Sequence, residues 1–540
     1  MAAAVPEDFG SYDYVIVGGG TAGCVLANRL SADPKVTVLL LEAGGKDDYF
    51  WIHVPIGYLY TMNNPRTDWC LKTEPEPGLN GRALAYPRGK VLGGCSSING
   101  MIYMRGQARD YDQWRQLGNT GWSWDDILPY FKRSEDHHAG DTDMHGEGGE
   151  WRVEQQRLHW PILDAFRDAA EEVGIPKTDD FNTGNNEGSG YFEVNQRRGV
   201  RWSTAKGFLR PARSRANLRV LTKARATQLI LENRTATGVA FLHERRSFRA
   251  QARGEVILTA GAVHSPHLLE LSGIGDPDIL REAGIDAVHA LPGVGENLQD
   301  HLQMRAVFKI KRGRTLNEQA NSLIGKMRMG LDYALFRRGP LSMAPSQLGL
   351  FAKSDPAKET PDLQYHIQPL STDKLGDPLH PFKAITASVC NLRPLSRGHI
   401  HLAGPDHEEP PRIRPRYLSA AEDRLTAAQA LRLTRRIMQA KAVAPFEPEE
   451  FLPGDHIQSD EALAEAAGDI GTTIFHPVGT CKMGTDPIAV VDPQLRVHGI
   501  TKLRVVDASV MPTITSGNTN GPVIMIAEKA ADMIRHARLD

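Results

Sequence analysis

Three glycines near the beginning of the sequence have the spacing with which many proteins hold a pyrophosphate. Gly18, Gly20 and Gly23 form G-x-G-x-x-G directly after the apolar run YVIV, and a helical segment follows them. In such a unit the first glycine allows a tight turn, the second lets the backbone approach the phosphates, and the third lets the helix pack on the strand. The helix N-terminus then offers free N–H groups and a positive dipole end to the phosphate.

An acidic residue stands at the expected distance from these glycines. Val36 to Leu41 is predicted to be a second strand, and Glu42 follows it, where an acid accepts hydrogen bonds from the ribose of an adenosine. The glycine pattern alone also occurs in ordinary α/β loops, but here the strand, the helix and the acid all agree with it. The stretch from Asp13 to Gly44 therefore predicts a Rossmann-like dinucleotide-binding unit.

Two stretches near the C-terminus carry side chains that could act on a substrate. His476 lies in TTIFHPVGTCKMG, and the second stretch is SGNTNGP, which ends at Pro522. A histidine after an apolar pair is more often a core residue, and G-N-T-N-G is also a good turn. However, proline is favoured at the first helical position, and the strongly helical VIMIAEKAADMI follows Pro522. Asn518 to Gly521 is therefore expected at a helix N-terminus, which would stabilise the negative charge of a reduced flavin.

The elements that position these residues indicate a discontinuous nucleotide domain. Glu255 to Leu258 is predicted to be a strand that leads into a small-residue turn and a short helix, which would add a strand to the same parallel sheet. Leu218 to Leu231 is predicted to be one further strand, and Leu503 to Val506 a buried one. Trp51 to Gly81 has no sustained period and is expected to be a long ordered loop.

A block from about residue 305 to 468 shows a different periodicity. Alternating runs at Asp362 to Gln368, Ala384 to Leu392 and His399 to Leu402 indicate an antiparallel sheet with one covered face. Helices are expected at Leu323 to Phe336 and at Ala420 to Lys441. We predict an α/β protein, α+β overall, whose nucleotide domain comprises 1–155, 206–304 and 469–540, and whose substrate-binding domain comprises 156–205 and 305–468.

Length and charge exclude several classes of protein. At 540 residues the chain exceeds what one hydrophobic core usually holds, so two domains are expected. Its 63 basic and 65 acidic side chains leave a net charge of -2. This balance gives the chain no overall electrostatic attraction to nucleic acid or to an anionic membrane. The start MAAAVPEDFG has no basic or apolar signal region, and no apolar run approaches the roughly 20 residues of a membrane span. We expect a soluble, cytoplasmic protein.

Cysteine and histidine usage suggests neither disulfides nor a metal. The five cysteines are few, scattered and odd in number, which fits a reduced compartment. A polar, Gly-rich segment contains His137, His138, Asp141, Asp143 and His145. These residues lack a fixed ligand spacing, so we expect no metal ion.

Two longer motifs add specificity to these patterns, and with them the chain resembles the glucose-methanol-choline (GMC) oxidoreductase family from end to end. Gly89 to Asn99 matches the first family signature, Gly261 to Gly275 (GAVHSPHLLELSGIG) matches the second, and Val294 to His301 is the family's V-G-E-N-L-Q-D-H. The resemblance implies FAD, a Rossmann-like FAD domain, an antiparallel sheet over the flavin and oxidation of an alcohol. It places His476 at the catalytic histidine and Asn520 at the second catalytic position, held by His or Asn.

The resemblance also implies which residues contact the cofactor. They are Gly18, Gly20, Thr21, Ala22, Gly23, Glu42, Ala43, Arg88, Gly93, Gly94, Asn99, Gly100, Met101, Ala226, Ala260, Asp507, Ala508, Asn518 and Thr519. Some relatives have a histidine at the position of Ile98 that bonds to the flavin. Ile98 has no nucleophile, so the FAD is expected to be non-covalent.

The residue types then suggest a mechanism. Histidine titrates near neutrality, so His476 can accept the hydroxyl proton while the carbinol hydrogen leaves as hydride to flavin N5, and the Asn520 amide can hold the alkoxide. The leading hypothesis is a dehydrogenase of a primary alcohol, similar to the choline dehydrogenase branch, with a quinone or dye-like acceptor. The alternatives are an oxidase using O2, a lyase or photodecarboxylase, and a binding protein with a structural flavin. No nucleic-acid partner is expected, and no oligomeric state follows from the sequence.

Overall fold

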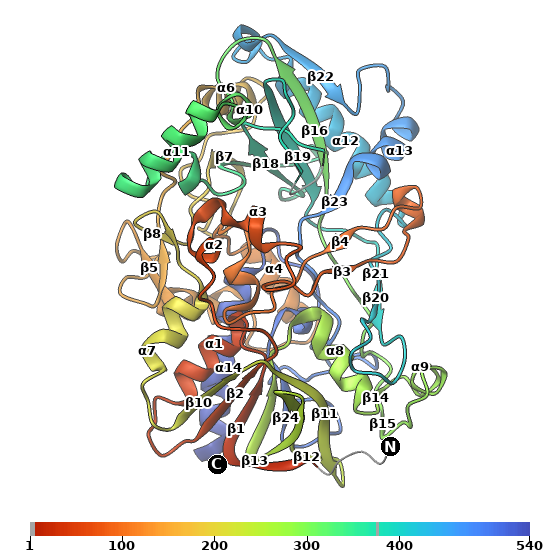
Figure 1. Cartoon of the computed structure of the whole chain (residues 1–540). Coiled ribbons are helices and arrows are strands. Elements are labelled where there is room, and N and C mark those ends of the chain that lie inside the picture. Colours follow the sequence, from red (N-terminus) through yellow and green to blue (C-terminus); the bar gives the residue numbers. More distant parts are fainter. Residues whose placement is uncertain (1–5, 374–376, 540) are drawn as a thin grey trace.

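Two large β-sheets form the framework of the protein, one above the other in Figure 1. The computed structural model describes residues 6–373 and 377–539. The lower sheet has the strand order β10-β2-β1-β13-β12-β11, and β24 also pairs with β13. Its strands are β1 (Glu7–Val17), β2 (Val38–Glu42), β10 (Leu218–Thr222), β11 (Ala224–Glu232), β12 (Thr235–His243), β13 (Arg246–Leu258) and β24 (Leu503–Val505).

The parallel part of the lower sheet is covered by helices and carries the glycine motif. β10, β2, β1, β13 and β24 run parallel, and every residue of β2 is buried, as expected for a strand with both faces covered. α1 (Thr21–Leu30) packs against the C-terminal helix α14 (Asn520–Leu539), which in turn packs against α5 (Trp124–Ser134). The Rossmann-like prediction for the opening unit is therefore confirmed.

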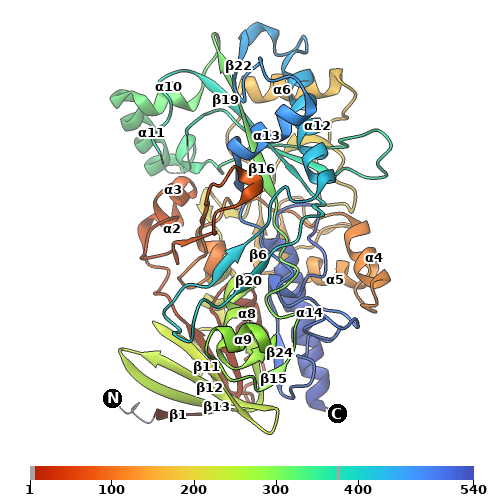
Figure 2. The same ribbon diagram turned by 90° about the vertical axis from the view of Figure 1, so that its right-hand side faces the viewer.

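The upper sheet is antiparallel and has the order β22-β16-β19-β18-β17-β7, with β23 paired to β16. α12 packs on this sheet and against α6 and α13 (Figure 2). The elements are β7 (Gly188–Tyr191), β16 (Leu302–Ile310), β17 (Leu348–Ala352), β18 (Leu363–Gln368), β19 (Ala384–Asn391), β22 (Pro448–Leu452), β23 (Gly471–Thr473), α6 (Pro161–Glu172), α12 (Ala421–Met438) and α13 (Asp460–Ile470).

Shorter elements connect the two sheets and surround their junction. The helices are α2 (Phe50–His53), α3 (Tyr58–Thr61), α4 (Ala108–Gln116), α7 (Arg210–Ala212), α8 (Gly261–Leu271), α9 (Pro277–Glu282), α10 (Leu316–Asn321) and α11 (Leu323–Phe336). The two-stranded pairs are β3 (Leu71–Lys72) with β4 (Ala85–Tyr86), β5 (Glu135–His137) with β6 (Trp151–Val153), β8 (Gln196–Arg197) with β9 (Val200–Arg201), β14 (Ile274–Gly275) with β15 (His289–Ala290), and β20 (His399–His401) with β21 (Arg412–Arg414). Within the described residues, no helix combines the length and the apolar character needed to cross a membrane.

The structure corrects three sequence expectations. The predicted single strand from Leu218 to Leu231 is two strands, because Lys223 has a positive φ of 56° and turns the chain out of β10. The segment from Trp51 to Gly81 is not one loop, since it contains α2, α3 and β3. Helix α14 begins at Asn520, so Pro522 is its third residue. A proline is tolerated there because the first turn of a helix has no internal partner for its N–H groups.

Candidate active site

A cavity of about 1780 Å³ lies at the junction of the two sheets. The glycine turn and the start of α8 line one end of it, and strands of the upper sheet line the other. Along β16, Leu302, Met304 and Ala306 point into the apolar core, whereas Gln303 and Arg305 line the cavity. The alternation of side chains along a strand thus gives the upper sheet one packed face and one face for a ligand.

The three predicted glycines have the different roles that their spacing suggested. A Cβ on Gly18, whose φ is +112°, would lie 2.6 Å from the carbonyl oxygen of Thr259, and a Cβ on Gly23 would lie 1.9 Å from that of Gly18. A Cβ on Gly20 would meet no protein atom closer than 3.9 Å. Gly18 and Gly23 are therefore required by the fold, whereas the space beside Gly20 is left open toward the cavity.

The N-terminus of α1 is suited to hold an anion in this space. Its first turn has no acidic residue, and no side chain caps it. A Cβ on Gly94 would lie 2.7 Å from the Cα of Gly20, so the turn at Gly93 and Gly94 closes against the same loop. The N–H of Gly93 donates to the carbonyl of Gly19 over 2.8 Å.

Two buried carboxylates organise the backbone around this end of the cavity. Glu42 accepts from the N–H groups of Gly19 at 2.8 Å and Gly44 at 2.7 Å, and burial raises its pKa to about 7. Asp507 accepts from the N–H of Gly261 at 2.9 Å and from the Ser265 hydroxyl at 2.6 Å. Asp507 thereby fixes the turn at the start of α8.

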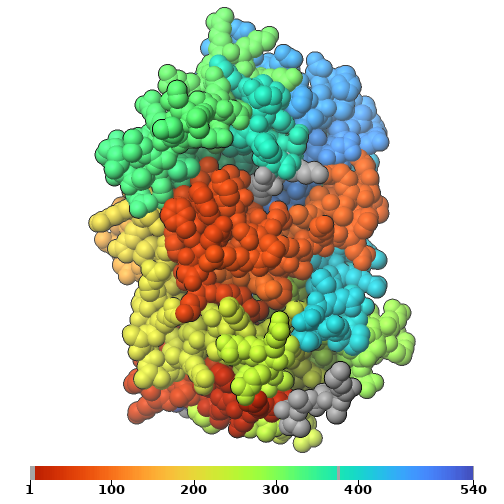
Figure 3. Space-filling view, in the orientation of Figure 1, coloured from red at the N-terminus to blue at the C-terminus, as the bar shows by residue number. Residues whose placement is uncertain are grey.

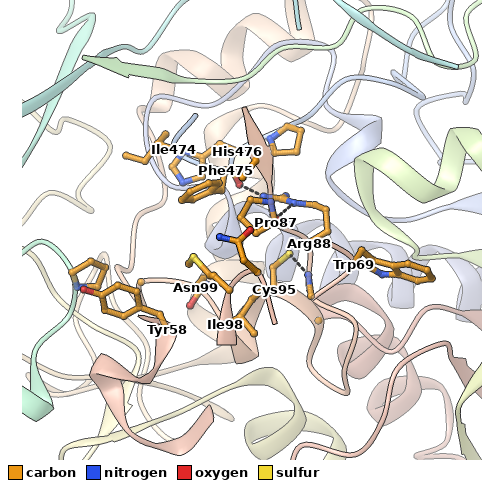
Figure 4. A pocket seen from close by; sticks show the side chains of 18 of the residues that line it. Tyr58, Trp69, Pro87, Arg88, Cys95, Ile98, Asn99, Ile474, Phe475 and His476 are labelled. Carbon is orange, nitrogen blue, oxygen red and sulfur yellow. Dashed lines mark hydrogen bonds between the residues drawn. The ribbon is translucent and has the colours of Figure 1, made fainter. Parts of the chain in front are cut away.

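His476 is nearly buried at the other end of the cavity, and its backbone is held on both sides. Its N–H donates to Asp300 at 2.8 Å. The preceding Phe475 has a positive φ of 70°, and its carbonyl accepts from the Arg88 guanidinium at 2.8 Å. Figure 4 shows His476, Phe475 and Arg88 close together above Ile98 and Asn99. The unusual backbone at Phe475 is thus stabilised by its surroundings and directs the His476 ring.

The hydrogen bonds around His476 determine which ring nitrogen carries the proton. Nε2 of His301 lies 3.2 Å from the carbonyl oxygen of Leu392, so this nitrogen must donate. Nδ1 of His301 is then an acceptor, and it lies 3.1 Å from Nδ1 of His476, which must carry the proton. Nε2 of His476 is therefore unprotonated and faces Asn518.

The amide beside His476 belongs to Asn518. Its Nδ2 lies 3.1 Å from Nε2 of His476, and its Oδ1 accepts from Nε2 of Gln364 at 3.1 Å, which fixes the amide orientation. Asn520 was expected in this place, but its Oδ1 accepts from the Thr21 hydroxyl at 2.8 Å. Its buried Nδ2 has no hydrogen-bond partner among the residues that the structure describes. Asn520 thus lies toward the start of α1.

Burial sets the charge state of the histidines here. Burial, with His301, His366 and Arg88 nearby, holds the pKa of His476 well below its ordinary value. Burial also lowers the pKa of His301 to about 4 and that of His366 to about 3. All three rings are therefore neutral at neutral pH, and His476 can accept a proton.

Most of the predicted contact residues line this cavity. They are Gly18, Gly20, Thr21, Ala22, Glu42, Ala43, Arg88, Gly94, Asn99, Gly100, Met101, Ala226, Ala260, Asp507, Ala508, Asn518 and Thr519, together with His476 and Asn520. Gly23 and Gly93 are not among the lining residues. Gly23 packs against the carbonyl of Gly18, and the N–H of Gly93 donates to Gly19, so both stabilise the turn. Sequence reasoning did not assign a role to Asp300, His301 or His366. The first two lie in the V-G-E-N-L-Q-D-H motif, whereas His366 lies on a strand without any motif.

The histidines of the histidine-rich segment form hydrogen bonds with acidic residues outside the segment, and not with Asp141 or Asp143. Nδ1 of His137 accepts the N–H of Ala139 at 3.2 Å, which leaves the proton on Nε2, and this nitrogen donates to Glu193 at 2.7 Å. His145 lies between Glu135 at 3.1 Å and Asp180 at 2.9 Å. His137, His138 and Glu193 lie close enough together to hold a metal ion, and a metal would displace the proton from the ring nitrogen that it binds.

Comparison with known proteins gives consistent relatives over nearly the whole chain. Models of the family described as GMC oxidoreductase match residues 12–303 and 394–527. An alcohol dehydrogenase [acceptor] of Pseudomonas putida is 42% identical over 97% of this chain and 95% of its own. The mitochondrial choline dehydrogenase of Homo sapiens is 41% identical over 99% and 91%.

Solved structures agree with this result. A pyridoxine 4-oxidase from Mesorbium loti superposes with a TM-score of 0.89 at 32% identity, covering 97% of this chain and 99% of that one. A formate oxidase variant from Aspergillus oryzae, studied for FAD modification, gives a TM-score of 0.92 at 27% identity over 99% of each chain.

Proposed function

The chain belongs to the GMC oxidoreductase family, and from this membership we propose that it is an FAD-dependent dehydrogenase that oxidises a primary alcohol to the aldehyde. It acts as an oxidoreductase on CH–OH donors, as its relatives named alcohol and choline dehydrogenase do. The observation that carries the finer proposal is the hydrogen-bond chain from Leu392 through His301, which leaves Nε2 of His476 unprotonated in the cavity.

The residues at the glycine-turn end of the cavity fit the pyrophosphate of FAD. The open space beside Gly20 and the uncapped start of α1 suit a pyrophosphate. The unpartnered Nδ2 of Asn520 offers a donor next to the same helix. When bound, FAD supplies the acceptor of the substrate hydride at flavin N5. We propose that it is bound non-covalently, because Ile98 places an apolar, buried side chain where some relatives have a linking histidine.

In this proposal His476 is the general base. Nε2 of His476 accepts the hydroxyl proton of the alcohol. His301 fixes the ring of His476 for this step, and Asp300 fixes its backbone. Asn518, rather than Asn520, holds the substrate oxygen through its amide N–H groups. Its Nδ2 already lies beside Nε2 of His476, and Gln364 prevents the amide from turning over.

Anaerobic mixing with primary alcohols tests the proposed function. An alcohol substrate should bleach the flavin absorbance in the absence of O2, whereas a lyase, a photodecarboxylase or a binding protein would leave it oxidised in the dark. If no alcohol among linear, aromatic and choline-like ones bleaches the flavin, the proposal is wrong.

An oxidase is the second candidate, supported by the similarity to pyridoxine 4-oxidase and to an oxygen-dependent choline dehydrogenase of Brucella ovis, which is 41% identical over 97% of this chain and 95% of its own. Mixing the reduced enzyme with O2 or with a quinone distinguishes the two. Fast reoxidation by O2 alone would favour the oxidase, and fast reoxidation by the quinone alone would favour the dehydrogenase.

A further inference from the structure

Helix α11 exposes a concentration of apolar side chains that no other described element of the chain matches. Six large apolar side chains of this helix are each between 54% and 79% exposed: Leu323, Ile324, Met327, Leu331, Leu335 and Phe336. The other strongly exposed apolar side chains among the described residues lie singly or in pairs on separate segments. Patches of this kind usually mark an interaction site.

The exposed side chains form one stripe, and the helix is held to the protein by its other side. Leu323, Ile324, Met327, Leu331 and Leu335 fall within an arc of about 120° when each residue turns the helix by about 100°. We call these five residues the apolar stripe. Tyr333 lies on the opposite face and is buried against Val54, Ile56 and Tyr58 of the α2–α3 segment.

Basic side chains accompany the apolar stripe. Lys326, Arg328, Arg337 and Arg338 are all exposed, and Asp332 is the only acidic residue from 323 to 338. The local charge is thus strongly positive, although the whole chain carries -2. An apolar face beside lysines and arginines is typical of helices that lie in the surface of a membrane with anionic lipids.

We propose that α11 binds the surface of an anionic membrane by inserting the apolar stripe among the lipids. A second copy of the chain fits less well. Two stripes packed antiparallel would bring Arg337 and Arg338 of one copy near Lys326 and Arg328 of the other, and like charges in contact oppose association. Anionic headgroups instead neutralise the basic side chains that flank the stripe, such as Arg328 and Arg338.

Helix α11 also forms part of the wall of the large cavity. Lys326 and Met329 of α11 and Asn321 of α10 line the cavity, and α11 lies beside α2 and α3 in both ribbon views (Figures 1 and 2). In the space-filling view α11 forms an outer edge of this face (Figure 3). Binding through α11 therefore places the cavity near the lipid surface, from which an apolar alcohol or a lipid-soluble acceptor can enter.

Sedimentation of the FAD-loaded protein with vesicles tests this inference. The protein should sediment with vesicles of phosphatidylcholine and phosphatidylglycerol, and less with phosphatidylcholine alone. Raising the salt from about 0.1 M to about 1 M, which shortens the Debye length from about 10 Å to about 3 Å, should weaken the binding. Replacing Arg328 and Arg338 by glutamine should weaken it about fivefold per residue on the anionic vesicles.

Serine substitutions in the apolar stripe provide the sharper comparison. Ile324→Ser, Met327→Ser and Leu331→Ser together should abolish sedimentation with vesicles. The matched control replaces Leu117, Leu395 and Leu425 by serine; these leucines are 49 to 57% exposed on other segments, and this variant should bind as the wild type does. Both variants should keep the wild-type FAD content, unfolding temperature and rate of flavin reduction by a soluble alcohol, so this test does not depend on the proposed function.

Three results would overturn the membrane proposal. The first is that the wild type fails to sediment with anionic vesicles at low salt, and the second is that the stripe variant sediments as well as the wild type. The third is a dimer in sedimentation velocity that the stripe substitutions convert to a monomer while vesicles bind neither form, which would assign the stripe to a second copy of the chain.

Discussion

At the scale of single residues, the protonation of His476 depends on atoms that do not line the substrate space. The carbonyl of Leu392 requires a proton on Nε2 of His301, and His301 in turn requires a proton on Nδ1 of His476. The proposed general base is therefore prepared by a backbone group two hydrogen bonds away. A carbonyl oxygen cannot exchange roles as a side chain can, so this arrangement fixes one tautomer.

Replacement of His476 tests this assignment. His476→Ala should slow flavin reduction by roughly 10² to 10⁴-fold, the usual worth of a positioned base, while FAD stays bound. His399→Ala, a histidine away from the cavity, is the control and should leave the rate unchanged. Anaerobic stopped-flow spectroscopy at the flavin band measures both. A rate near that of the wild type in His476→Ala would return this residue to a structural role.

The pH dependence of the same reaction follows from the lowered pKa of His476. A base is lost as the pH falls through its pKa, and burial places that pKa well below the ordinary value of about 6.5. The reduction rate should therefore stay constant around neutral pH and decline only in clearly acidic buffers. This acidic decline should be absent in His476→Ala. A decline centred at or above pH about 6.5 would show that the pKa is not depressed.

Asn518 and Asn520 are expected to have separable roles. Asn518→Ala should slow flavin reduction by roughly 10² to 10³-fold, the usual loss when a donor to a developing oxyanion is removed. Asn520→Ala should leave the reduction step nearly unchanged and weaken FAD binding, since its free Nδ2 lies near α1. Stopped-flow reduction and titration of the apoprotein with FAD measure the two effects. The opposite pattern would restore Asn520 as the catalytic amide.

His476 lines the cavity, its catalytic role stays a prediction, and the sequence could not separate the two asparagines. Both stand in one Gly-rich turn, two positions apart, and only the start of α14 decides which side chain faces the histidine. His366 is a stronger example. Its strand β18 was predicted, yet His366 lies at the cavity because the same sheet also pairs β16 with β23, which precedes His476 and is distant in the chain. Such contacts leave no local pattern.

At the scale of elements, the strand–turn–helix unit was the most predictable part because each glycine has a local physical reason. The alternating strands β18 and β19 and helix α12 were also predicted, since their apolar periodicity reflects burial. Helix α11 was predicted as well, although most of its apolar side chains are exposed. The split between β10 and β11 was missed. The residue that separates them, Lys223, adopts a positive φ without being glycine or asparagine, so no turn signal marks it.

A pair of glycine substitutions tests the phosphate cradle. Gly20→Val should give a folded protein with little bound FAD, because the added side chain meets only the space left for the cofactor. Gly23→Val should fail to fold, because its Cβ would lie 1.9 Å from the Gly18 carbonyl. The ratio of flavin to protein absorbance and circular dichroism distinguish these outcomes. Full FAD occupancy in Gly20→Val would show that the phosphates lie elsewhere.

At the scale of the whole molecule, two sheets of different construction share one cavity. The parallel sheet offers helix N-termini and glycine turns, whereas the antiparallel sheet offers alternate side chains such as Gln303 and Arg305. We propose that the division into a cofactor domain and a substrate domain follows these sheets near the bounds predicted from the sequence, although those bounds cut β16 and put β23, which pairs with β16, in the cofactor domain. The net charge of the chain did not predict the basic helix α11, because a sum over 540 residues does not reveal a local excess of basic side chains.

A non-covalent cofactor between the two sheets should make global stability depend on free FAD. A ligand that binds only the folded state adds about 2.7 kcal/mol to the free energy of unfolding when its concentration is 100 times its Kd. FAD would contact both sheets and so stabilise both. The unfolding temperature of the holoprotein should therefore rise with added FAD and fall after dialysis against a flavin-free buffer. Acid precipitation should release the flavin into the supernatant, since Ile98 forms no covalent bond. Flavin in the pellet, together with an unfolding temperature that ignores added FAD, would indicate a covalent link formed by another residue.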